Sequence, residues 1–256
     1  MLSTQLQWTT QNVSITWLLC FMVVSFIAAG VVKGTLGVGL PLIAVPLLAL
    51  ILPPHTAISL MAVPVLASNL WQAVDAKHPV AYFKRFAPLS IALFFSTLIS
   101  VRLAMALPTH LLSSLVAISI ILAVGLMMYK PQQAIAPRYE TGLGIVVGIL
   151  GGIMGGVSSL TGPFVIAYLL ALRVSREEFV GSISIIYLFS VVPLYASLAF
   201  YGRLGWVEAA FSLAAVVPMM LGMHFGKRLR HKLSENVFRR VIQGFLTLVA
   251  ILLLVK

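Results

Sequence analysis

Long apolar stretches follow one another along almost the whole chain, and short polar loops separate them. Ten such segments lie between residues 13 and 255. They cover residues 13–29, 41–52, 57–74, 86–107, 111–129, 141–155, 163–172, 179–201, 207–225 and 241–255. A helix needs about 20 apolar residues to cross the hydrocarbon core of a bilayer. The pattern therefore predicts an all-α, polytopic membrane protein.

Two of the segments are too short to cross a membrane. Residues 41–52 and 163–172 each follow a glycine-rich stretch, and each begins with a proline. Proline is well tolerated in the first turn of a helix, where its missing N–H group costs little. We expect these segments to be half-helices, each paired with the preceding segment in a hairpin whose tip stops inside the membrane.

The glycine-rich stretch occurs twice with the pattern GxxxGxxG, at residues 30–37 and 148–155, which are 118 residues apart. A proline and the sequence LLAL follow each copy, and Pro41 and Pro163 are 122 residues apart. The order of these features indicates an internal duplication, with repeats at 13–129 and 141–255. The two spacings imply four extra residues in the second copy, between residues 156 and 162.

A second feature is also duplicated. Ser96, Ser100 and Arg102 in the first half correspond to Gly222, Gly226 and Arg228 in the second half, at a spacing of 126. Small residues four positions apart allow neighbouring helices to approach closely. The arginine then lies at a helix C-terminus, where the helix dipole favours a cation. We interpret this feature as a packing element followed by an interfacial anchor.

The composition agrees with a membrane protein, because 61% of the residues are hydrophobic and only 9% are charged. The net charge of +11 does not indicate nucleic-acid binding, since the basic residues lie in loops between apolar segments without interleaved aromatics. Cys20 is the only cysteine, so the chain cannot form an internal disulfide framework.

The basic residues also predict orientation, because cytoplasmic loops are enriched in lysine and arginine. If the loop after residue 225 is cytoplasmic, alternating crossings place 13 basic residues inside and three outside. The three are Arg102, Arg203 and Lys256. This count requires each hairpin to enter and leave on one side, with both chain termini outside. Five segments per half is an odd number, so the two repeats have opposite orientation, which is typical of secondary transporters.

These features resemble the TauE/SafE sulfite exporter family, also called the 4-toluene sulfonate uptake permease family. The resemblance rests on residues 34–39 with the sequence GTLGVG, on Pro41, on residues 57–59 with the sequence AIS, and on the small-xxx-small-x-Arg element. Val38 and Leu40 interrupt the longer glycine run that is common in the family. The resemblance implies a multi-pass transporter of the bacterial inner membrane for sulfur-containing and other organic anions.

The two hairpin tips are the predicted anion site. Unwound backbone and the first turn of a half-helix leave N–H groups free for an anion, and glycine allows its close approach. Ser68 and Asn69 would line the same route, as would the polar cluster Ser182, Ser184 and Tyr187. The substrate-binding candidates are Lys33, Gly34, Thr35, Gly37, Gly39, Pro41, Ser68, Asn69, Gly152, Gly155, Gly156, Ser158, Ser159, Thr161 and Pro163.

Each candidate also has an alternative structural role. The glycines can serve tight helix packing, the hydroxyls can bond to backbone carbonyls, and the polar residues of the third segments can bond between helices. Lys33 is the one full charge in either motif, and an ionisable residue at membrane depth is a functional candidate. It can instead extend its ammonium group to the interface.

No motif indicates an enzyme, a metal or a cofactor. The five histidines are scattered, and the Ser158 region has no histidine or aspartate placed to activate a nucleophile. The six carboxylates lie near segment ends, so no acidic coupling-ion site is visible. We therefore predict export of a small anion, with coupled uptake by proton or sodium as the alternative. The expected partners are the anionic substrate and the bilayer, and a homodimer is compatible with a small transporter.

Overall fold

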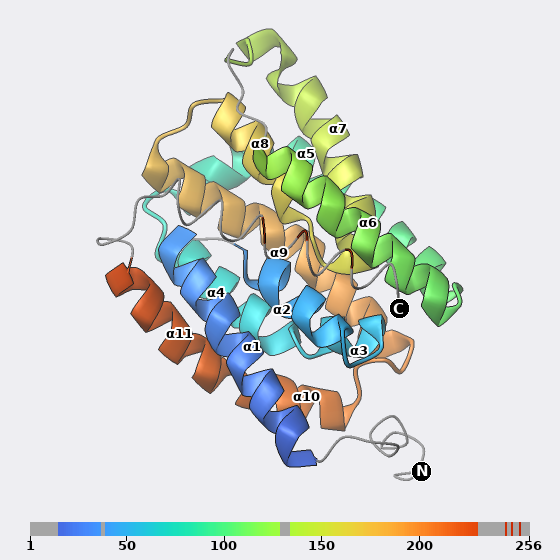
Figure 1. The fold of residues 1–256 in the computed structure, drawn as a ribbon. Helices are drawn as coiled ribbons and strands as arrows, with labels where there is room; N and C mark the ends of the chain where they lie inside the picture. Colours follow the sequence, from blue (N-terminus) through green and yellow to red (C-terminus); the bar gives the residue numbers. More distant parts are fainter. Residues whose placement is uncertain are drawn as a thin grey trace.

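The computed structural model describes residues 15–36, 39–128 and 134–229, together with Gly244, Thr247 and Ile251. Gly37 and most of the predicted segment 241–255 lie outside the described residues. Within them every regular element is a helix (Figure 1). The helices are α1 (Ile15–Leu36), α2 (Leu40–Ala49), α3 (Pro54–Ser59), α4 (Ala62–Val74), α5 (Pro79–Met105), α6 (Thr109–Met128), α7 (Pro137–Ser158), α8 (Gly162–Ala171), α9 (Arg176–Phe200), α10 (Trp206–Ala214) and α11 (Val216–Leu229).

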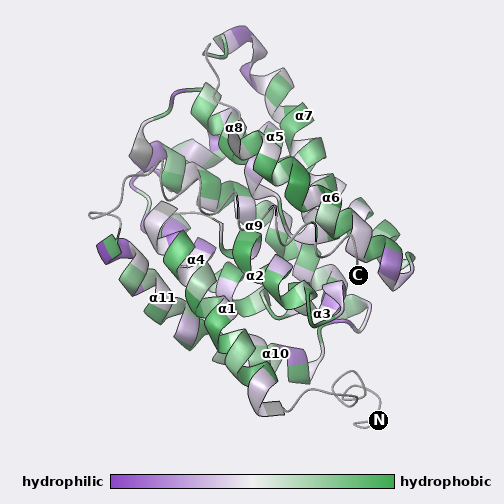
Figure 2. Cartoon of the chain, viewed as in Figure 1, coloured by the Kyte–Doolittle hydropathy of each residue, from purple (hydrophilic) through white to green (hydrophobic). Residues whose placement is uncertain are grey.

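Seven stretches in the described part of the chain are long and apolar enough to cross a membrane. Apolar residues cover the helices along most of their length, and polar residues gather at helix ends (Figure 2). The seven stretches are Thr16–Thr35, Pro54–Val74, Pro79–Met105, Thr109–Leu126, Pro137–Ser158, Glu177–Phe200 and Trp206–Leu229. The predicted all-α polytopic membrane protein is thus confirmed at this level.

Two predicted segments are each divided into two helices. The segment 57–74 breaks after α3, and the segment 207–225 breaks after α10. A proline ring clashes with the carbonyl of the residue four positions earlier and offers it no N–H group. Pro64 acts in this way on Leu60, and Pro218 on Ala214. The hydrophobic pattern does not reveal either break, because both sides of it are equally apolar.

The two short helices match the prediction of half-helices. Both α2 and α8 have ten residues, and each has a proline in its first turn. Eight of the ten residues of α2 are buried, so protein rather than lipid surrounds it. This environment is necessary, because unwound backbone at membrane depth is tolerated only where protein or a polar cavity surrounds it.

The described glycines of the two motifs, Gly30 and Gly34 in α1 and Gly148, Gly152 and Gly155 in α7, lie inside long helices. In Figure 1, α1 lies beside α11. A Cβ added at Gly30 or Gly34 would collide with the backbone carbonyls of Met219 or Met223 on α11. Because both residue numbers rise together, the two helices run parallel. Their backbones are in contact, so only glycine fits at these positions.

The reverse contact completes this interface. A Cβ on Gly222 or Gly226 of α11 would collide with the carbonyls of Ile27 or Val31 on α1. The glycine motif of the first half therefore packs against the small-xxx-small element of the second half.

The other long pair, α5 with α7, repeats this arrangement. A Cβ at Gly152 or Gly156 of α7 would lie 2.8 Å from the carbonyl oxygen of Leu93 or 2.9 Å from that of Thr97. In return, Ser96 Oγ donates a hydrogen bond of 2.8 Å to Ile149 O. Ser100 Oγ donates one of the same length to Ile153 O. Here the serine hydroxyls take the places of Gly222 and Gly226.

These contacts correct the register of the duplication. Gly30 and Gly34 make the contacts that Gly152 and Gly156 make, which is a spacing of 122 rather than 118. The bounds of α1 and α7 differ by 122 at both ends, as do those of α2 and α8. The four extra residues expected in the second copy do not exist. In this register, Lys33 corresponds to Gly155.

Candidate functional site

Lys33 lies in the last turn of α1 and is only 3% exposed. Among the described residues it is the only buried charged side chain. Its Nζ donates a hydrogen bond of 3.2 Å to Oδ1 of Asn69 on α4. The ammonium group therefore does not extend to the interface. Because asparagine is neutral, this contact provides no counter-charge, and a charged group without one is costly to hold in a membrane.

Asn69 has an unused donor at the same place. It is 2% exposed, and its Nδ2 has no hydrogen-bond partner within the described structure. A buried amide group without a partner costs free energy that a ligand oxygen can recover. The neighbouring Ser68 differs, because its Oγ donates to Val65 O at 3.2 Å and thus serves its own helix.

The other candidates of the first tip make structural contacts where the chain is described. Thr35 Oγ1 lies 2.7 Å from Val31 O and 3.3 Å from Gly226 O, so it supports the packing of α1 on α11. Gly34 is part of the same interface. Gly39 has a φ of 98°, a left-handed conformation that glycine adopts at little cost, and Pro41 starts α2. Gly37 lies outside the described residues.

The second tip begins where α7 ends at Ser158. Ser158 Oγ donates to Met154 O at 2.7 Å, which is the bond to its own helix foreseen as the alternative. Ser159 follows with a φ of 61°, and its buried hydroxyl has no hydrogen-bond partner in the described part of the chain. Gly152 and Gly156 belong to the α5 interface, and Pro163 lies in the first turn of α8.

Thr161 connects the second tip to the centre of the protein. Its Oγ1 lies 2.6 Å from Ser190 Oγ on α9. Ser190 Oγ in turn lies 3.3 Å from Thr97 Oγ1 on α5. A Cβ on Gly155 would collide with the Thr161 and Ser190 hydroxyls, so this glycine makes room for them. The tip is thus lined by neutral hydroxyl groups.

The sequence analysis missed Ser190 and Thr97. Ser190 lies 122 residues after Ser68, so the corrected register would have identified it as the counterpart of a candidate. Thr97 lies within the second duplicated feature, which we interpreted as packing only. Tyr195 was also not among the predicted residues. Its buried hydroxyl lies close to that of Ser159, but the two groups do not form a well-formed hydrogen bond.

Polar groups of the two halves lie level with each other along α4 and α9. Ser184 Oγ on α9 donates to Gln72 Oε1 on α4 at 3.0 Å, and Lys77, just after α4, pairs with Glu177. These contacts make α4 and α9 antiparallel. Asn69, three residues before Gln72, therefore lies level with Tyr187, three residues after Ser184. Tyr187 is nine residues from Glu178, which is about 14 Å along a helix.

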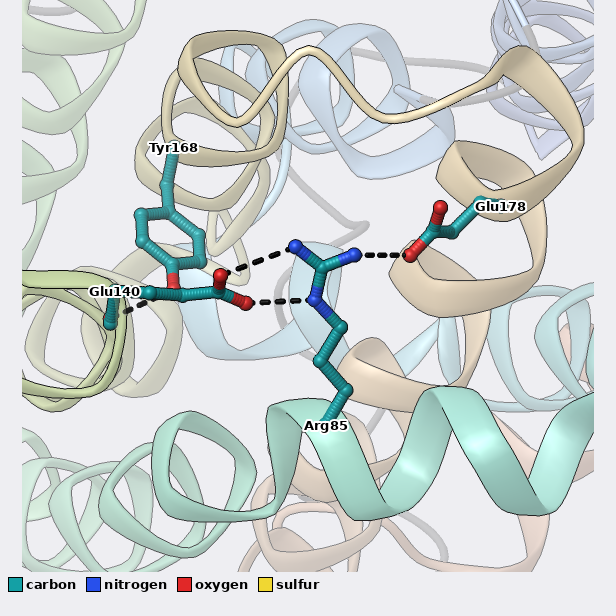
Figure 3. A network of polar contacts seen from close by, with 4 residues as sticks. All are labelled: Arg85, Glu140, Tyr168 and Glu178. Atoms are coloured by element: carbon teal, nitrogen blue, oxygen red, sulfur yellow. Dashed lines mark hydrogen bonds and ion pairs between the residues drawn. The ribbon is translucent and has the colours of Figure 1, made fainter. Parts of the chain in front are cut away.

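A layer of ion pairs lies at one end of helices α4, α5, α7 and α9. Arg85 on α5 lies between two carboxylates, Glu140 of α7 and Glu178 of α9 (Figure 3). The Tyr168 hydroxyl of α8 donates to the backbone carbonyl of Glu140 at 2.9 Å. The hydrogen bond with Glu177 raises the pKa of Lys77 at the same end. These residues lie in or beside the loops after α4, after α6 and after α8. The charge pattern predicts these three loops on one side of the membrane, and in the structure their residues lie together.

Comparison with known proteins identifies the family. The family described as sulfite exporter TauE/SafE matches residues 21–253, which is nearly the whole chain. No curated protein and no solved structure matches the chain. Within the described residues, no group of three histidine, cysteine, aspartate or glutamate side chains could hold a metal ion. With its seven apolar spans, the chain is a multi-pass membrane protein of a transporter family, and it belongs to the sulfite exporter TauE/SafE family.

Proposed function

We propose that this protein exports small sulfur-containing anions, of the sulfite or organosulfonate class, across the bacterial inner membrane. Family membership supports the transport of such anions. The observation that carries the proposal is Lys33, a buried ammonium group whose hydrogen-bond partner is neutral. An uncompensated positive charge at membrane depth attracts an anion and is functional by default.

The substrate site lies between the two hairpin tips in this proposal. Lys33 of the first hairpin and Asn69 of α4 form one side of this site, and Thr161 and the start of α8 form the other. The dipole of a half-helix and its free N–H groups favour an anion without adding a full charge. The second tip thus complements the charge of the first.

Transport proceeds by alternating access between two inverted repeats. Three observations support this arrangement: the register of 122, the equivalent interfaces α1–α11 and α5–α7, and the asymmetry of basic residues. In transporters of this kind, one repeat or bundle moves against the other around a site near the midplane.

The energetics favour export without a coupling ion. With an inside-negative potential, moving one negative charge outward gains about 2.3 kcal/mol per 100 mV. A dianion such as sulfite gains about 4.6 kcal/mol, enough for a gradient above a thousandfold. Uptake would need a coupling ion, and none of the described carboxylates is buried to bind one.

The test is flux in proteoliposomes that contain the purified full chain. We expect labelled sulfite or an organosulfonate to move toward the positive side of an imposed potential, and acetate to move much more slowly. Reversing the potential should reverse net flux. Flux that instead requires a proton or sodium gradient would support the uptake permease, and equal flux in protein-free liposomes would refute transport.

A further inference from the structure

Tyr187 on α9 carries a buried hydroxyl group, and the packing of the hairpin glycines gives no reason for a polar atom at this place. The side chain is 9% exposed, and its Oη has no partner in the described structure. A Cβ built on Gly162 would lie 2.5 Å from this Oη. Gly162 is the first residue of α8, so the hydroxyl points at the N-terminus of a ten-residue helix.

The start of α8 has no side-chain cap that would compete with a ligand. Thr161 occupies the capping position, but its hydroxyl makes no capping hydrogen bond and pairs with Ser190 instead. The first N–H groups of a helix lack partners within the helix, and they carry the positive end of its dipole. The Tyr187 hydroxyl thus lies beside a helix end that has no side-chain cap.

We propose that Tyr187 and the N-terminus of α8 form an oxyanion subsite, in which the tyrosine hydroxyl donates a hydrogen bond to a substrate oxygen. The substrate class rests on the proposed function. Lys33 Nζ is hydrogen-bonded to Asn69, which lies level with Tyr187 along the antiparallel helices α4 and α9. Donors from α1, α4, α8 and α9 together select a small anion with several acceptor oxygens, such as sulfite or a sulfonate.

This role explains why a polar atom is left unpaired in an apolar protein. A buried hydroxyl without a partner destabilises the empty protein, and an anionic oxygen removes that penalty on binding. Gly162 contributes by having no Cβ, because any side chain there would occupy the space beside the hydroxyl.

The experiment is isothermal titration of the detergent-purified full chain with sulfite and, separately, with 2-aminoethanesulfonate. Tyr187→Phe should bind the anions about 10- to 100-fold more weakly, as expected for the loss of one hydrogen bond to a charged group. Its thermal unfolding temperature should not fall, because the substitution removes an atom that has no protein partner. A purely structural tyrosine would show the opposite pattern, with a lower unfolding temperature and an unchanged Kd.

Tyr168→Phe is the matched control. It removes a hydroxyl that donates to Glu140 O at the far end of α8, so its Kd should equal that of the wild type. Wild-type affinity in Tyr187→Phe would overturn the subsite, and so would a wild-type protein that binds neither anion. Anion binding that depends on Tyr187, without any flux in proteoliposomes, would support the subsite and refute only the transport function.

Discussion

Lys33 and Gly155 occupy equivalent positions in the two halves and differ completely in chemistry. The corrected register aligns them, and both lie in the last turn of the helix that leads into the tip. One half presents an ammonium group, while the other leaves space for the hydroxyls of Thr161 and Ser190. In the proposed site the anion would meet one charged and one neutral face, an arrangement that avoids the cost of a second buried charge.

Replacement of Lys33 tests the charged face. We expect Lys33→Gln to lower the transport kcat/KM about tenfold or more, because a hydrogen bond to a charged group contributes about 1.5–3 kcal/mol. Lys33→Arg should be milder, since the charge is kept. The measurement is proteoliposome flux at matched protein content, with Lys84→Gln on an exposed turn of α5 as the control.

Folding should not suffer in Lys33→Gln, since it removes an uncompensated buried charge. Flux like that of the wild type in this variant would contradict a role for Lys33 in attracting the anion.

At the scale of elements, the described glycines of the motifs pack α1 against α11 and α7 against α5. Gly34 and Gly156 each face a backbone carbonyl of the partner helix across the two halves. This outcome favours the alternative role that the sequence analysis left open for the glycines. The interfaces position the ends of α1 and α7, and the tips begin there.

Alanine substitutions test these interfaces. We expect Gly34→Ala and Gly156→Ala each to lose folded, monodisperse protein, because a Cβ collides with partner backbone and overpacking costs about 1–3 kcal/mol. Size-exclusion chromatography and thermal unfolding in detergent measure the loss. Gly125→Ala on α6 is the control, since its Cβ would meet no atom within 4 Å. Equal stability of all three variants would contradict close backbone packing at these two interfaces.

The sequence predicted the helices and the duplication better than it predicted the tips. The length of the apolar stretches and the two prolines identified the long spans and the half-helices, because both features can be read from local composition. The register was wrong because glycines recur every four residues in α7, so a shift of one helical turn matches almost as well. The pairing of Lys33 with Asn69 and of Thr161 with Ser190 could not be predicted, since side-chain contacts between distant helices leave no periodic signal in one sequence.

At the scale of the whole molecule, the ion pairs join helices from both halves at one end. Arg85 of α5 contacts Glu140 and Glu178 of the second half, and the three side chains are partly exposed. We expect Arg85→Gln to destabilise the protein by about 1 kcal/mol or less, because solvent and salt screen such pairs. Thermal unfolding at low and high salt checks this, with the smaller difference between wild type and variant at high salt. A loss that is large and independent of salt would contradict it.

The same layer fixes which loops share a side of the membrane, and the basic residues predict that this side is the cytoplasm. Asp75 follows α4 next to the ion-pair layer, whereas Gly205 lies beyond the far end of α9, before α10. On a Cys20→Ala background, we expect an impermeant thiol reagent to label Gly205→Cys in intact cells. Asp75→Cys should react only after the membrane is permeabilised, which also serves as the control for its reactivity. The reverse result would invert the topology, and with it the direction in which the membrane potential drives the anion through the site. Labelling of both cysteines in intact cells would instead separate the ion-pair layer from the cytoplasmic side and remove the basis for two oppositely oriented halves.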